Sequence, residues 1–74
     1  MRSESLKILL QRDPCPVLRL HLSSGMIFDI LDPDLAVVTP ATVELLLPPD
    51  PSGHREAVIN LREITWVEVI TSPG

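Results

Sequence analysis

The chain has 74 residues, which suffice for one small domain, predicted over residues 1–74. A domain of this size buries only about 60% of the surface that its unfolded chain exposes, so it usually needs a further source of stability. The single cysteine, Cys15, excludes an internal disulfide, and the two histidines fall short of a usual metal site. Because hydrophobic residues make up 45% of the chain, association between copies remains as that source, and we predict a homo-oligomer without cofactor or metal.

The net charge of −4 is unevenly distributed along the chain. Residues 20–54 contain five acidic side chains and neither lysine nor arginine. A surface that follows a phosphate backbone needs the opposite charge, so this distribution disfavours RNA as a ligand. No stretch reaches the roughly 18 apolar residues of a membrane span, and the first residues lack the apolar core of a signal peptide. We therefore expect a cytoplasmic protein without membrane contact.

Residues 3–12 are typical of a short helix. Leu6, Leu9 and Leu10 share one helical face, which predicts that this face packs against the rest of the domain. Pro14 and Pro16 follow and end the helix, because proline lacks a backbone donor and disfavours helical geometry in the residue before it.

From residue 17 the hydrophobic period changes to two, which is typical of half-buried strands. Leu18, Leu20 and Leu22 alternate with polar side chains, and Gly25 supplies the tight turn that follows. Proline and small polar residues predict an exposed loop over 48–55, and residues 62–64 predict a single helical turn. The predicted strands are residues 17–23, 26–31, 35–47 with an interruption near Pro40, 56–61 and 65–70.

One helix followed by short strands and turns predicts a mainly β domain, a small five-stranded barrel, closed or nearly closed, over residues 17–70. The inward positions of the strands should form its core. The residues expected to be mostly buried are Leu18, Leu20, Leu22, Phe28, Ile30, Val37, Val43, Leu45, Ile59, Val67 and Val69.

Three segments carry a family resemblance. Residues 18–28, LRLHLSSGMIF, read as an alternating strand, a glycine turn and a second strand; residues 32–38, DPDLAVV, read as a bend into a third. Residues 58–67, VINLREITWV, read as a closing segment. Together they resemble the Sm-like fold, the small barrel shared by Sm, Lsm and Hfq proteins. An SH3-like barrel fits the same pattern, so both remain open.

The resemblance implies two RNA-contact positions, Asp34 and Arg62. The sequence departs from the family's pockets at both, because no asparagine follows Asp34 and Arg62 precedes Glu63 where the family has glycine. An exposed Arg62 that pairs with Glu63 is the simpler interpretation. Sm-like RNA binding is therefore the alternative function.

No motif indicates catalysis. His21 alternates with core leucines and should point outward, without a carboxylate or nucleophile that the sequence can place beside it. Cys15 follows the C-terminal end of a helix, which does not activate a thiol. Asp29, Asp32 and Asp34 crowd a bend without the pattern of a calcium loop. We predict that the protein is not an enzyme.

The last two strands predict an interface. An Sm-like barrel leaves their edges exposed, and exposed edges pair with other chains. On the final strand, Trp66, Glu68 and Ile70 should face outward, unless Trp66 covers the core of its own barrel. Ala57 and Ile59 belong to the penultimate strand. We predict a ring of copies, joined between these two strands, that presents a multivalent surface to a protein partner.

Overall fold

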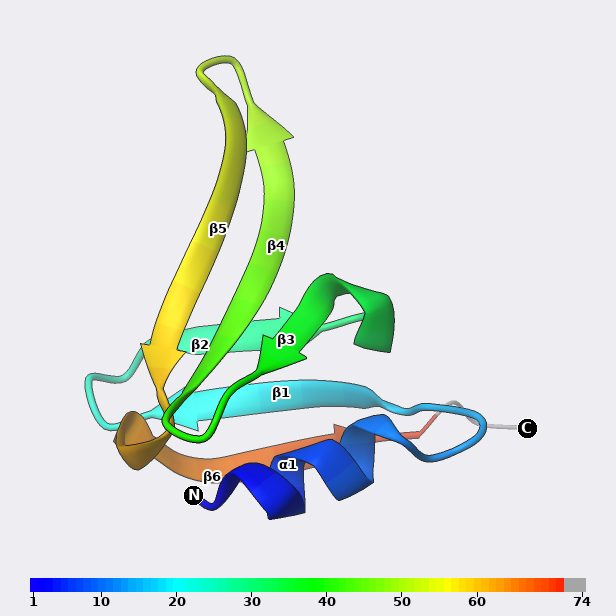
Figure 1. Cartoon of the computed structure of the whole chain (residues 1–74). Helices are drawn as coiled ribbons and strands as arrows, with labels where there is room; N and C mark the ends of the chain where they lie inside the picture. The colour runs from blue at the N-terminus through cyan, green and yellow to red at the C-terminus, as the bar shows by residue number, and fades with distance from the viewer. Residues whose placement is uncertain (72–74) are drawn as a thin grey trace.

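The computed structural model describes residues 1–71, which form one helix and six strands. The strands make two antiparallel three-stranded sheets, in the orders β2–β1–β6 and β3–β4–β5 (Figure 1). The elements are α1 (Ser3–Leu10), β1 (Val17–Leu22), β2 (Ile27–Ile30), η1 (Pro33–Leu35), β3 (Ala36–Val38), β4 (Thr42–Asp50), β5 (Gly53–Asn60), η2 (Leu61–Glu63) and β6 (Ile64–Ile70).

The predicted mainly β domain with an N-terminal helix is confirmed, but the predicted five-stranded closed barrel is not what the described residues form. The interruption predicted near Pro40 is present, and it divides the segment over 35–47 into two separate strands, because Pro40 stands in a turn between β3 and β4. The hydroxyl of Thr39 accepts hydrogen bonds from the N–H groups of Ala41 and Thr42, at 3.3 and 2.9 Å, and so closes that turn. No ladder of hydrogen bonds joins the two sheets within residues 1–71.

The alternating side chains of β1 determine which residues enter the core. Leu18 and Leu20 are fully buried, while Arg19 and His21, which alternate with them along the strand, point to the opposite face of the sheet. β1 pairs with β2 on one side and with β6 on the other, with Leu20 opposite Phe28 and Val67. The central position of β1 thus gives its leucines neighbours on both sides.

Two single helical turns connect the sheets. In η1, the carboxylate of Asp32 accepts a hydrogen bond from the N–H of Asp34 at 2.9 Å, and the chain passes from β2 into β3. In η2, the N–H of Leu61 donates to the carbonyl of Ala41 at 2.9 Å, while the carbonyl of Glu63 accepts from Ser23 at 2.8 Å. The second turn therefore contacts loops of both sheets.

Helix α1 covers the core through Leu6, which is fully buried, and it contacts β3. It ends at Leu10, two residues before the predicted end. Gln11 still donates to the carbonyl of Lys7 at 3.0 Å, but Pro14 then forces the preceding residue out of helical geometry, so the last turn cannot continue.

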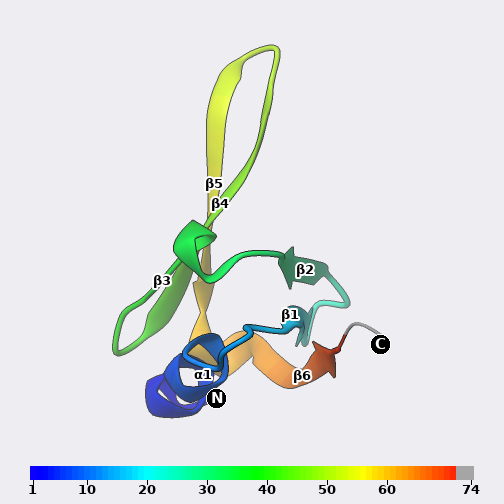
Figure 2. The ribbon, with the colours of Figure 1, turned by 90° about the vertical axis from the view of Figure 1, so that its right-hand side faces the viewer.

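The segment predicted as a loop over 48–55 is instead the end of a projecting hairpin. β4 continues to Asp50 and β5 begins at Gly53, and the two strands rise well above the rest of the molecule (Figures 1 and 2). Pro48 and Pro49 are tolerated because they lie where the register shifts between Leu47 and Asp50, a position that needs no ladder donor.

The core contains most of the predicted residues, with two corrections. Val37 is 60% exposed, because Ala36 and Val38 on either side of it face Leu45 and Val43. Val69 is 37% exposed, because β6 is an edge strand and has no neighbour on one side. The buried residues are Leu6, Leu18, Leu20, Leu22, Ile30, Val43, Leu45, Ile59, Leu61 and Ile64, with Phe28 and Val67 packed against them.

Candidate functional site

The two strands predicted as an interface, β5 and β6, lie at the edges of their sheets. β5 pairs only with β4, and β6 pairs only with β1, so each presents one row of backbone donors and acceptors without a ladder partner among the described residues. Ala57 is half-buried and Ile59 is 4% exposed. Because Ile59 packs in the core, β5 can meet a neighbour through its backbone but not through that side chain.

The outer face of the β2–β1–β6 sheet places an aromatic pair beside the edge. The rings of His21 and Trp66 stack with their centroids 3.7 Å apart and their planes at 6°. The Nε2 atom of His21 lies 3.2 Å from Oε1 of Glu68. Trp66 is 54% exposed, so it does not cover the core of its own domain, and Ile70 is half-buried farther along β6.

An ion pair occupies the next position on the same face. The guanidinium of Arg19 donates from Nε and one terminal nitrogen to the two carboxylate oxygens of Asp29, at 2.9 and 3.2 Å. These hydrogen bonds lower the pKa of Asp29 below its ordinary value of 3.8. The charges that this sheet presents next to Trp66 are therefore matched by opposite charges.

The carboxylate of Glu68 lies beside His21, which the sequence alone could not predict. The described contacts of His21 include no nucleophile. The hydroxyl of Thr65 donates at 2.9 Å to the backbone carbonyl of His21, and the ring itself contacts Glu68 and Trp66. No group of three acidic, histidine or cysteine side chains within residues 1–71 is placed to hold a metal ion.

The outer face of the β3–β4–β5 sheet has a different character. Val37, Glu44 and Val58 form one row across the three strands, and Leu46 and Glu56 form the next. Val37, Leu46 and Val58 are each at least half exposed. With Asp34 and Leu35 of η1, residues of these rows line a cavity of about 270 Å³. Apolar and acidic side chains thus alternate on an uncovered sheet face.

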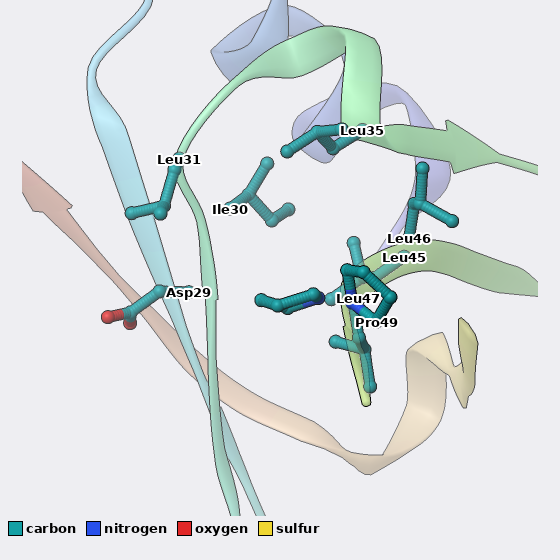
Figure 3. Close-up of a pocket in the computed structure, with 9 residues that line it drawn as sticks. Asp29, Ile30, Leu31, Leu35, Leu45, Leu46, Leu47 and Pro49 are labelled. Carbon is teal, nitrogen blue, oxygen red and sulfur yellow. The ribbon is translucent and has the colours of Figure 1, made fainter. Parts of the chain in front are cut away.

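A second cavity, of about 260 Å³, adjoins the first at Leu35, Leu45 and Leu46. It opens between the end of β2 and the base of the projecting hairpin, and its walls are almost wholly apolar (Figure 3). The carboxylate of Asp29, at the margin, points away from the leucines. The lining comprises Ile30, Leu31 and Leu35 on one side and Leu45, Leu46, Leu47, Pro48 and Pro49 on the other.

We call the two adjoining cavities the hairpin groove. Sequence reasoning missed it, although one signal was available. Leu45, Leu46 and Leu47 are consecutive in a strand, so at least one of them had to face away from the core. Leu46 does so and is 50% exposed. An uninterrupted apolar run in a strand with only one buried face therefore indicates a contact surface.

The two residues that the family resemblance marked for RNA do not meet. Arg62 is exposed in η2 and lines a cavity of about 300 Å³ with Pro40, Ala41 and Asn60. Asp34 is exposed in η1, at the opposite end of the body (Figure 1). Among residues 1–71 no ion pair joins Arg62 to the neighbouring Glu63, so the expected pairing is also absent there.

None of the helices formed by residues 1–71 has the length and apolar character needed to cross a membrane. Comparisons with protein-family models, with curated proteins and with solved structures found no match to this chain. What the fold and the surface support is therefore a small β-rich domain whose last two strands, like β2 and β3, are edge strands, with an uncovered groove on one sheet.

Proposed function

We propose that the protein is a non-catalytic assembly module. Copies join through the free edges of β5 and β6 into a closed ring, and the ring presents a repeated surface to a protein partner. The observation that supports this most directly is that the last two strands are edge strands in two different sheets.

Free edges of this kind act as templates for pairing, and natural proteins usually protect them with proline, inward-pointing charge or a covering element. Within β5 and β6 no proline occurs, and no strand among residues 1–71 pairs with their outer edges. Joining β5 of one copy to β6 of the next makes a head-to-tail contact, which either closes into a ring or grows into a fibre. A ring pairs the β5 and β6 edges of every copy.

The strand arrangement adds a second argument. The chain passes from β2 through η1 into β3, so the two sheets follow each other in the order β6–β1–β2 and β3–β4–β5 with the final strands outermost. This order resembles the open Sm-like arrangement, in which the same edges serve for assembly. The similarity to the Sm-like arrangement consists of the strand order and the position of the N-terminal helix. It supports the proposal of a ring.

Exposed apolar side chains supply the third argument. Ten large hydrophobic side chains within residues 1–71 are more than a third exposed, and three of them lie on β5 and β6: Val58, Trp66 and Val69. Strand pairing between copies would place β5 and β6 side by side and remove part of this area from water. Each Å² of apolar surface so covered contributes roughly 25 cal/mol.

Light scattering at micromolar concentration tests the ring. We expect a defined oligomer, and a clean monomer would overturn the proposal. Val67→Pro should dissociate it, because proline cannot donate to a ladder and its ring obstructs pairing. Circular dichroism checks that this variant keeps its strands, since the substitution also affects β6 within its own sheet.

A second variant keeps the test decisive if Val67→Pro fails to fold. Val69→Lys places a charge at a partly exposed position of the same edge strand, and edge lysines oppose strand pairing. It should yield a folded monomer. The matched control is Ile8→Lys, because Ile8 is 61% exposed on α1 and belongs to neither of the two strands that the ring would join. Dissociation of the control as well would show that net charge, and not the β6 edge, determines assembly.

RNA binding at Arg62 is the alternative, and one observation favours it. Arg62 lies beside the turn between β3 and β4, and these segments line one cavity. A mobility-shift assay with a mixed RNA pool at low salt tests it. A tight, salt-sensitive shift that Arg62→Gln removes and Arg12→Gln retains would rank RNA above a protein partner. We expect no such shift.

A further inference from the structure

We propose that the hairpin groove binds a basic, apolar peptide segment of a partner protein, with an apolar side chain in the cavity of Figure 3 and lysine or arginine beside Glu44 and Glu56. This deepens the proposed function, because it names the partner chemistry and the surface that each copy contributes. The argument rests on the shape of the cavity, on unmatched charge and on the uncovered sheet face.

The apolar half fits a side chain better than a cofactor. Its volume is about 260 Å³, which is below the roughly 300–1,000 Å³ typical of small-molecule sites. Such sites also hold a few convergent polar groups that orient the ligand. Here the one charged lining residue, Asp29, is engaged by Arg19 on the other face. A single leucine, isoleucine or phenylalanine of a peptide needs no such polar group.

The acidic half determines the charge of the occupant. Asp34, Glu44 and Glu56 line the adjoining cavity, and none of the ion pairs within residues 1–71 involves them. Arg55 is the only arginine or lysine in β3, β4 and β5, and it contacts Asp50 and the carbonyl of Pro48 near the hairpin end. Three carboxylates without a cation beside them complement a positively charged segment and repel nucleic acid.

The two halves together suit a segment whose groove-facing side chains are apolar at one end and basic at the other. They adjoin through Leu35, Leu45 and Leu46, so one segment that crosses both would meet apolar wall first and carboxylates next. Val37, Leu46 and Val58 lie between and beside those carboxylates on the sheet face. Because successive side chains of an extended peptide point to opposite sides, only every second residue faces the groove, and among those positions apolar residues should be followed by basic ones.

Fluorescence anisotropy tests the site on the full chain with a labelled peptide of about eight residues, which has leucine at every second position of its first half, lysine at every second position of its second half and serine between them. We expect saturable binding that weakens as salt rises. Two control peptides replace lysine with glutamate or leucine with serine, and neither should bind. Equal binding of the leucine–glutamate peptide, or no binding of the leucine–lysine peptide, overturns the proposal.

Matched variants locate the binding. Glu44→Gln with Glu56→Gln should raise the Kd about tenfold at low salt, because two carboxylates are lost from the groove. Glu4→Gln with Glu63→Gln removes the same charge from exposed positions elsewhere and should leave the Kd unchanged. On the apolar side, Leu46→Ser should weaken binding and Ile8→Ser should not. Equal losses within either pair would mean that net charge or general hydrophobicity determines affinity.

Light scattering of the same variants separates this proposal from the ring. The monomer expected of Val69→Lys should bind the peptide as the wild type does. A monomeric wild type that binds the peptide overturns the ring alone, and a ring that ignores the peptide overturns the groove alone. If Glu44→Gln alone, on the central strand β4 and outside both joined edges, changes the oligomeric state, the groove is occupied by a second copy, and the partner proposal is wrong.

Discussion

The two sheets have the same number of strands, but the side chains on their outer faces differ in character. On the β2–β1–β6 sheet, Arg19 is held by Asp29 and His21 by Glu68 and Trp66. On the β3–β4–β5 sheet, Glu44 lies in one row with the exposed Val37 and Val58, and no ion pair within residues 1–71 includes it. On the first face, charged side chains pair with side chains of opposite charge. On the second face, carboxylates without an ion pair among the described residues lie beside exposed apolar side chains.

The difference shows where the domain depends on something beyond itself. A monomer commonly exposes single hydrophobic residues, whereas contiguous exposed apolar surface rimmed by polar groups marks a contact site. The paired face contributes to the stability of the domain, and we assign contact with a partner to the unpaired one. Substitutions should therefore affect stability on one side and association on the other.

The largest change in stability is expected in the core, away from both outer faces. Leu20→Ala removes a fully buried side chain from the central strand β1 and should lower the free energy of unfolding by about 2–5 kcal/mol. Because small domains are stable by only about 5–15 kcal/mol, this loss should be visible in a thermal melt. Leu46→Ala, at a position 50% exposed, serves as the control and should stay within about 0.5 kcal/mol of the wild type. Similar losses for both would contradict the assignment of faces.

A smaller effect should separate the two faces directly. Glu68→Gln weakens the contact with His21 on the paired face and should cost up to about 1 kcal/mol in urea unfolding. Glu44→Gln removes a carboxylate that makes no ion pair in residues 1–71 and should leave the unfolding free energy nearly unchanged. A reversed order would mean that Glu44 stabilises the domain and that the faces are alike.

The smallest effect concerns acid stability. The hydrogen bonds from Arg19 lower the pKa of Asp29 from 3.8 in the folded chain, so this carboxylate stabilises the fold above its ordinary pKa. That contribution is lost as the pH falls through the lowered folded value. Asp29→Asn should therefore flatten the fall in melting temperature below about pH 4, and Arg19→Gln should flatten it equally. If the double variant shows a still smaller fall in melting temperature at low pH than either single variant, the two residues act separately.

Much of the fold could be predicted because local patterns determine it. The period of two in β1, the positive φ of Gly25 and the proline after α1 each act within a few residues. The hairpin was missed for the opposite reason. Pro48 and Pro49 look like loop residues in sequence, and only the register shift against β5 makes room for them.

The candidate site was harder to predict because it depends on which strands become neighbours. Leu35 and Leu46 are far enough apart in sequence that no local pattern relates them, yet they line the same two cavities. The edges of β5 and β6 follow from the strand order, which the family resemblance suggested. Ile59 shows the limit of that approach, because an edge strand can still direct a side chain into the core.

The projecting hairpin has a consequence for how the chain opens. β3 pairs with β4 only as far as Leu45, so residues 46–55 form a ribbon of two strands without a third. Such ribbons are marginally stable on their own. The ribbon can therefore unzip from its end while both sheets stay folded, and its amide protons should exchange with solvent faster toward the end and more slowly toward Val43 and Ile59. A segment bound in the groove would lie against the base of this ribbon, so hydrogen exchange along the hairpin reports whether the groove is filled.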